Sequence, residues 1–209
     1  MTMRSKWAVV PGLIALATAA VLLSAYSGAS TPQDRAPEQP IAFPHPVHVK
    51  TLGMNCLYCH YAADKSPDPG LPALGTCTGC HQPGLIGPQR PASPAGPART
   101  SEELAKLFQY ASDSIPIPWV RIHKVPDYVQ FPHMRHVNAG VTCQSCHGQV
   151  QDMGRVYQAE SLNMGWCVNC HVNGYSIAEG IRAAGREPTA EQLDVPRLRA
   201  RYDCSVCHY

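Results

Sequence analysis

The sequence predicts a loop-rich fold of short helices with a small side-chain core, preceded by one long apolar helix. Three observations lead to this prediction. The 209 residues include 20 Pro and 16 Gly, which interrupt regular elements. Phe occurs only three times, so few large side chains are available for a core. Ten cysteines are present, which is a high count for this length. A compact chain of this composition needs something other than side chains to fill its interior.

The apolar N-terminal stretch runs from Trp7 to Ser30 and follows two basic residues. About 20 helical residues span a bilayer core of about 30 Å, whereas the apolar part of a cleaved signal has about 7–15 residues. We therefore expect residues 1–30 to be an uncleaved, single-pass membrane anchor. Cleavage at the small residues 27–29 is the alternative. The preceding positive charges predict a cytoplasmic N-terminus and an exported remainder.

A proline-rich tether is expected over 31–44, followed by one domain over 45–209. Within this domain, residues 82–99 are rich in Pro and Gly and predict an irregular surface loop. The net charge is +2 without long basic runs, so nothing indicates nucleic-acid binding.

Two helices have start signals. Thr100 and Glu103 form a capping-box pattern before a helix over 101–111, whose apolar residues share one face. Thr189 and Gln192 form a second pattern at the start of another expected helix, and Pro196 limits its length.

An internal repeat organises the domain. Residues 43–49 read Phe-Pro-His-Pro-Val-His-Val, and residues 131–137 read Phe-Pro-His-Met-Arg-His-Val. Each copy is followed by a Gly, a CxxCH motif, a spacer and a second CxxCH motif. The pattern indicates a duplicated two-motif unit with one further motif at the end.

All ten cysteines fall into five CxxCH motifs, the attachment signal for c-type haem. Two thiols can bond the two vinyl groups of one porphyrin edge, and the next histidine then supplies the proximal iron ligand. Structural zinc sites and redox disulfides also use CxxC pairs, but neither requires a histidine after every pair. The sequence therefore predicts five covalent haem c groups. The attachment cysteines are Cys56, Cys59, Cys77, Cys80, Cys143, Cys146, Cys167, Cys170, Cys204 and Cys207, and the proximal ligands are His60, His81, His147, His171 and His208.

Distal ligands can come from the histidines outside the motifs. Five histidines remain, enough for all five irons: His45, His48, His123, His133 and His136. In each HxxH pair, one histidine can bind the haem just downstream while the other reaches a neighbouring haem. His123 stands alone and could instead be an ordinary polar residue. Met153 or Met164 is a possible replacement for one histidine, with simple packing against porphyrin as the alternative.

Catalytic signals are lacking. The chain has no variant CxxCK motif that would leave an iron with an unusual ligand, and no Walker, GxGxxG or GxSxG pattern. With enough candidate ligands for every iron, no haem needs an open face for substrate. We expect an electron carrier without a catalytic site of its own.

The apolar N-terminus, the FPHxxHV units, the segment MGWCVNCH over 164–171 and the total of five motifs together resemble the pentahaem cytochrome c subunit of alternative complex III. The FxHxxH-plus-CxxCH unit alone is also similar to small class III multihaem cytochromes. The first resemblance implies a bacterial respiratory or photosynthetic complex in the cytoplasmic membrane, with the haem domain on the periplasmic face. It implies an iron–sulfur/molybdopterin-like subunit, polytopic quinol-binding subunits, and a monohaem cytochrome c or another periplasmic acceptor as partners.

The sequence thus predicts an electron-transfer subunit of a quinol-oxidising membrane complex. Two alternatives remain open. One is a small membrane-anchored multihaem quinol dehydrogenase, which would be active without polytopic partners. The other is a multihaem reductase in which one haem keeps an open coordination position.

Overall fold

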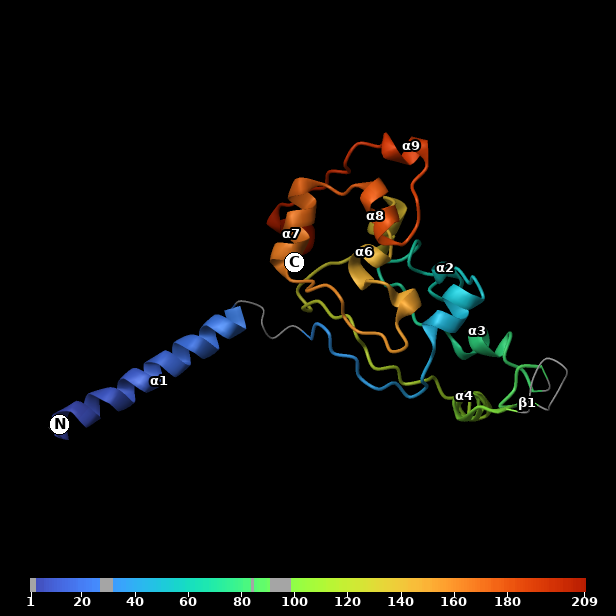
Figure 1. Cartoon of the computed structure of the whole chain (residues 1–209), viewed down its shortest axis with the longest axis horizontal. Coiled ribbons are helices and arrows are strands. Elements are labelled where there is room, and N and C mark those ends of the chain that lie inside the picture. The colour runs from blue at the N-terminus through green and yellow to red at the C-terminus, as the bar shows by residue number, and fades with distance from the viewer. Residues whose placement is uncertain (1–2, 27–31, 84, 91–98) are drawn as a thin grey trace.

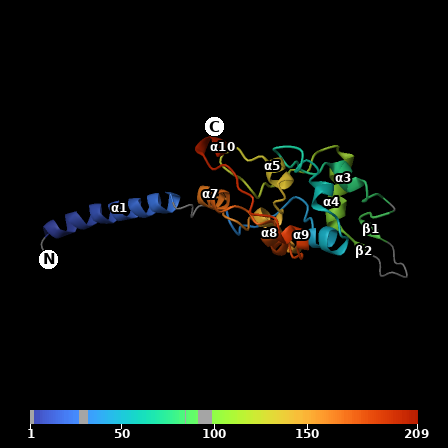
Figure 2. The same ribbon diagram turned by 90° about the horizontal axis from the view of Figure 1, so that it is seen from above.

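The computed structural model describes residues 3–26, 32–83, 85–90 and 99–209. Its first element is a long helix, α1 (Met3–Tyr26), which lies apart from the rest of the chain in both views (Figures 1 and 2). Among the described residues, no helix is both long enough and apolar enough to cross a membrane. The membrane-spanning helix expected over residues 1–30 is therefore not found. The alternative cleavage site at 27–29 and the first residue of the expected tether lie outside the described residues.

Short helices separated by turns make up the remainder, as the Pro and Gly content predicts. They are η1 (Pro46–Thr51), α2 (Cys56–Cys59), α3 (Leu74–Thr78), α4 (Glu102–Ser112), α5 (His133–Asn138), α6 (Gln144–His147), η2 (Val150–Asp152), α7 (Met164–Asn173), α8 (Ile177–Ala183), α9 (Ala190–Leu193) and α10 (Cys204–Cys207).

Two very short strands, β1 (Gln89–Arg90) and β2 (Arg99–Thr100), pair antiparallel. They pair the middle of the segment predicted as an irregular loop, 82–99, with its C-terminal end. Residues 84 and 91–98 of that segment lie outside the described residues.

Helix α4 confirms the predicted helix but begins one residue later. Its N-cap is Ser101, whose hydroxyl accepts from the Leu104 amide. The expected pairing of Thr100 with Glu103 is wrong. Because Glu103 lies in the first turn near another segment, its carboxylate instead accepts from the Ala42 amide (2.6 Å) and from Lys106 (2.7 Å).

The buried face of α4 forms the main apolar cluster. Leu107 is 5% exposed and packs with Ile41 and Ile117. Leu74 and Cys77 of α3 pack against this cluster. The second cysteine motif is thereby held against α4.

The second capping box is confirmed. The Thr189 hydroxyl accepts from the Gln192 amide, and the Gln192 side chain accepts from the Thr189 amide. Helix α9 has only four residues and ends at Leu193, ahead of Pro196.

Side chains bury little of this chain. Its accessible surface is 14779 Å², against about 9,500 Å² for a compact protein of 22.7 kDa. The separate helix α1 accounts for part of the excess. Only eight hydrophobic residues among those described are buried. The structure therefore agrees with the prediction that side chains alone do not fill the interior.

Candidate functional site

Each cysteine motif lies on or overlaps a short helix: α2, α3, α6, α7 and α10 in chain order. Cysteines three apart on a helix face the same side, as attachment to one porphyrin edge requires. Asparagines begin two of these helices, with the Asn55 side chain accepting from the Leu57 amide (2.9 Å) and Asn163 from the Trp166 amide (2.8 Å). None of the ten cysteines forms a disulfide, so all remain available for attachment.

Backbone carbonyls orient three of the five histidines predicted as proximal ligands. The Nδ1 atoms of His60, His81 and His171 donate to the carbonyls of residues 70, 86 and 201, at 3.4, 3.3 and 2.6 Å. A donated Nδ1 proton leaves the Nε2 lone pair free, which is how metal-binding histidines are commonly fixed. The residues present therefore fit an iron bound through Nε2.

Three of the four HxxH histidines are held in the same way. Nδ1 of His48 donates to the Pro44 carbonyl and Nδ1 of His136 to the Pro132 carbonyl, both at 3.1 Å. The two bonds are equivalent in the two copies of the repeat. His133 donates to the Pro67 carbonyl, also at 3.1 Å, which links the second copy to the first.

Three histidine pairs are spaced as ligands of one metal would be. With a metal–nitrogen bond of about 2 Å on either side, the centres of two opposed imidazole rings lie roughly 6 Å apart. The ring centres are 6.0 Å apart for His48 and His81, and 6.2 Å for His136 and His171. They are 6.3 Å apart for His133 and His147. The second histidine of each HxxH pair thus faces the second motif of its own repeat.

His45 lies beside the first motif. Its burial, together with the nearby His60 and His48, lowers its pKa to about 4. Its Nδ1 atom is buried and has no hydrogen-bond partner among the described residues. His45 with His60 corresponds, in the first copy, to His133 with His147 in the second.

Burial also lowers the pKa of His147, to about 3, with His123, His133 and His60 adding to the effect. An imidazole with a low pKa is neutral at pH 7. The neutral form is the one that binds a metal, so this environment suits a ligand.

The fifth motif has different surroundings. The Tyr128 ring stacks on the His208 ring at 5.7 Å, and the Gln130 amide donates to the Cys207 carbonyl at 2.7 Å. Among the described residues, no histidine ring is paired with His208 at the spacing of the three pairs above. His123 instead contacts His147, with its Nε2 atom 3.3 Å from Nδ1 of His147.

The two candidate methionines differ in position. Met153 is buried, and a Cβ placed on Gly148 would lie 3.1 Å from its methyl group. It therefore packs beside the third motif. Met164 begins α7 and is 67% exposed.

Neighbouring thiols relate the motifs to one another. The Cys143 thiol hydrogen-bonds Cys56 and lowers the pKa of Cys56 to about 6, so the first and third motifs adjoin. Burial and the nearby charge of Cys59 raise the pKa of Cys77, which places the second motif next to the first.

The remaining motifs continue the series. Burial, with Cys170 and Cys167 nearby, raises the pKa of Cys146 to about 12. Burial, with Cys207 nearby, raises the pKa of Cys167. The motifs therefore follow one another in the order second, first, third, fourth and fifth. In Figure 1, α6 and α2 lie between α7 and α3. Figure 2 shows α7 and α10 toward α1 and α3 on the far side.

One supporting residue, Tyr175, was not found from the sequence. Its hydroxyl accepts from the Thr142 amide (3.1 Å) and lies 3.0 Å from the Ser145 hydroxyl within the third motif. Gly180 leaves room for it, because a Cβ there would lie 1.6 Å from the hydroxyl oxygen. No sequence pattern marks this contact, which joins the residue two positions before α8 to α6 and the residue preceding Cys143.

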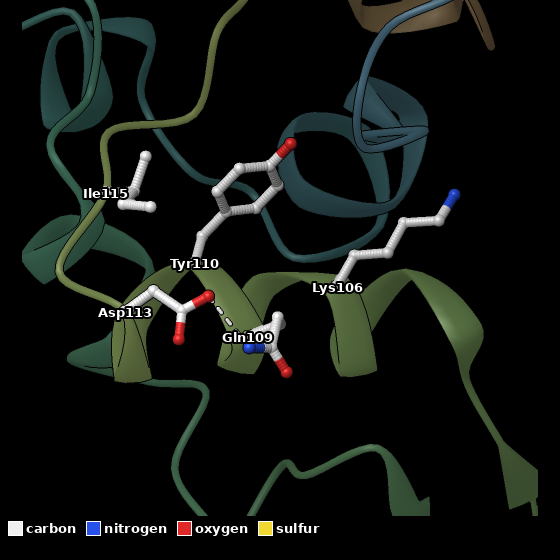
Figure 3. A pocket seen from close by; sticks show the side chains of 5 residues that line it. All are labelled: Lys106, Gln109, Tyr110, Asp113 and Ile115. Atoms are coloured by element: carbon white, nitrogen blue, oxygen red, sulfur yellow. Dashed lines mark hydrogen bonds between the residues drawn. The ribbon is translucent and has the colours of Figure 1, made fainter.

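A surface hollow of about 310 Å³ lies along α4, lined by Lys106, Gln109, Tyr110, Asp113 and Ile115 (Figure 3). Gln109 donates to Asp113 across its edge at 2.8 Å. None of the lining residues is a cysteine or histidine, so this hollow has no attachment chemistry. Among the described residues, no cluster suited to a bare metal ion is assembled either, as structural zinc would require.

Similarity to known proteins agrees with this geometry. Residues 129–209 match the family described as cytochrome c7 and related cytochrome c. The matched region contains the second HxxH pair and three of the five motifs. The chain is also 28% identical over 156 residues to the multiheme cytochrome c subunit of menaquinone reductase from Nitratidesulfovibrio vulgaris (strain Hildenborough). That match covers 65% of this chain and 69% of the relative. These similarities support a multihaem cytochrome c that binds haem c and transfers electrons.

Proposed function

We propose that this chain is the five-haem electron-transfer subunit of a membrane-bound quinol-oxidising complex of the alternative complex III type, with no catalytic site of its own. The observation that carries the proposal is the continuous series of five attachment motifs, in which three histidine pairs have the spacing of ligands to one iron. Bound haem would supply one-electron redox chemistry, while the chain sets position, ligands and burial.

Different residues of the chain would attach the haems and bind their irons. The ten motif cysteines would hold the porphyrins, and the motif histidines would bind iron on the proximal side. On the distal side we assign His45, His48, His133 and His136 to the first, second, third and fourth motifs in that order. Carbonyl acceptors on Nδ1 fix the imidazole tautomer and orientation for most of these rings.

Electrons would pass along the five motifs in the order given above, so the proposed electron-transfer path has two ends. The second motif, packed against α4, forms one end, and the fifth, at α10, forms the other. Electrons would therefore enter and leave at these two motifs. The proposed partners are an iron–sulfur/molybdopterin-like subunit, polytopic quinol-binding subunits and a periplasmic acceptor such as a monohaem cytochrome c. We place the haem domain on the periplasmic face of the cytoplasmic membrane.

A second candidate reverses the direction of electron flow. The relative from N. vulgaris is named as a subunit of a menaquinone reductase, so its complex is named for delivering electrons to a quinone. The same five-motif series would serve this direction equally well. The direction depends on the partners and on the potentials at the two ends.

The test is purification from native membranes in mild detergent, with mass spectrometry of this chain and its partners. The proposal expects five haems per chain and co-purifying iron–sulfur and polytopic subunits, with a complex that oxidises quinol. Menaquinone reduction by the same complex would favour the second candidate. A chain that purifies alone and oxidises quinol would refute both and favour a small quinol dehydrogenase.

A membrane assay tests the location separately. Residues 1–30 are replaced by a cleavable export signal, and the chain is followed through alkaline extraction of membranes. Release of the replaced chain but not of the native chain supports attachment through this segment. Equal retention of both would mean that partner subunits hold the chain at the membrane.

A further inference from the structure

His147 of the third motif differs from most other histidines in the group that contacts its Nδ1 atom. Six other histidines place Nδ1 against a backbone carbonyl. In His147 the partner of Nδ1 is a side chain, with Nε2 of His123 at 3.3 Å. The two rings meet edge to face, with centres 4.3 Å apart and planes at 77°. Both rings are part-buried, which limits competition from water.

The proton positions follow from the role of His147. As a proximal ligand it must keep the Nε2 lone pair for iron, so its ring proton is on Nδ1. That proton is donated to Nε2 of His123. A neutral His123 then carries its own proton on Nδ1, and neither of its nitrogens has a lone pair left for iron.

We propose that His123 is the hydrogen-bond acceptor that positions and polarises His147, and is not an axial ligand. The inference rests on the proposed haem-binding role of the third motif. It departs from the simplest count, in which all five non-motif histidines bind iron. His133 already lies at ligand spacing from His147, with ring centres 6.3 Å apart and nearly parallel ring planes (15°).

Two consequences can be measured. An acceptor that draws on the Nδ1 proton makes the imidazole a stronger donor to iron, which favours the oxidised state and lowers the reduction potential. Loss of this acceptor should raise the potential of one haem. In addition, only four distal histidines remain for five irons, so the haem of the fifth motif has no distal histidine from this chain.

The experiment compares His123→Leu and His123→Gln in the full-length, haem-loaded chain. We expect five haems by mass in each, and no new high-spin ferric signal by electron paramagnetic resonance. Redox titration should show one of the five potentials shifted upward in the leucine variant. Glutamine retains an acceptor oxygen, so the shift should be smaller. A new high-spin signal in both variants would overturn the proposal, because it would show that His123 binds iron.

His133→Leu is the matched control. It removes the proposed distal ligand of the same haem and should convert one iron in five to the high-spin form. This result would show that the assay detects the loss of a single ligand.

The native chain provides a test that requires no variant. It contains ten histidines, so five bis-histidine haems would use all of them, including His123. Near-infrared magnetic circular dichroism counts such haems by their charge-transfer bands. We expect no more than four; a count of five would refute the inference. A chain carrying fewer than five haems would instead refute the proposed function, so the two failures are distinguishable.

Discussion

Substitution of Gly148 by alanine should destabilise the third motif more than the addition of one methyl group would suggest. Gly148 directly follows the proximal histidine and has φ 69° and ψ −166°, a backbone conformation that essentially only glycine adopts. A Cβ at this position would lie 2.6 Å from the Cβ of Ala159 and 3.1 Å from the methyl group of Met153. The methionine tip can rotate away, but Ala159 cannot move without its backbone.

The expected loss in the free energy of unfolding has two parts. The backbone conformation costs about 1–3 kcal/mol for a residue other than glycine, and overpacking adds about 1–3 kcal/mol. The expected loss in the free energy of unfolding is therefore about 2–6 kcal/mol. Gly185→Ala is the matched control, because Gly185 also has a positive φ (71°) but nothing lies within 4 Å of its added Cβ. Its expected loss is only about 1–2 kcal/mol.

Denaturant unfolding of the haem-loaded chain, followed by circular dichroism, measures these differences. A double variant, Gly148→Ala with Ala159→Gly, should recover the overpacking part and leave the backbone part. If Gly148→Ala costs no more than Gly185→Ala, or if the double variant recovers nothing, the packing argument is refuted.

Three further predictions concern the core, a cap and pH. Leu107→Ala should lower the unfolding free energy by about 2–5 kcal/mol, because it leaves a cavity in the main apolar cluster. Thr189→Ala should cost about 1 kcal/mol in the same assay, through loss of one half of a capping box. The pKa of His45 is lowered from 6.5 to about 4 and that of His147 to about 3. Below pH 6.5 the unfolded state therefore binds more protons than the folded state, and stability should fall as the pH drops toward 4. Denaturant midpoints measured from pH 7.5 to pH 4 check this sign.

Each of these has a control or a contradicting outcome. Leu193→Ala is the control for the core, since Leu193 is 51% exposed and should lose little. Gln192→Ala should cost a similar amount to Thr189→Ala, because both halves of the box are formed. A stability that rises on acidification from pH 6.5 would contradict the assignment of neutral, buried histidines.

Several features of this protein could be predicted from the sequence because they depend on residues close together in the chain. The cysteine spacing places two thiols and a histidine within one helical turn, and the capping box of α9 involves residues three apart. Both are local, so the pattern is sufficient. The predicted start of α4 was wrong by one residue because Ser101, not Thr100, caps the helix. Glu103 instead accepts from a distant group, the Ala42 amide.

The arrangement of the site depends on contacts between distant residues. Backbone carbonyls orient most of the histidine rings, and every residue type has a carbonyl, so no sequence signal marks these acceptors. The spacing of 6.3 Å between His133 and His147, and the contact of His123 with His147, result from packing between segments separated by loops.

The sequence by itself therefore determined the attachment chemistry and the small core, because both follow from composition and local spacing. Only the tertiary structure decided which histidines face one another and in which order the motifs lie. The physical reason is that axial ligation joins two rings across a metal, and the partner ring can come from anywhere in the chain that folding brings within about 6 Å.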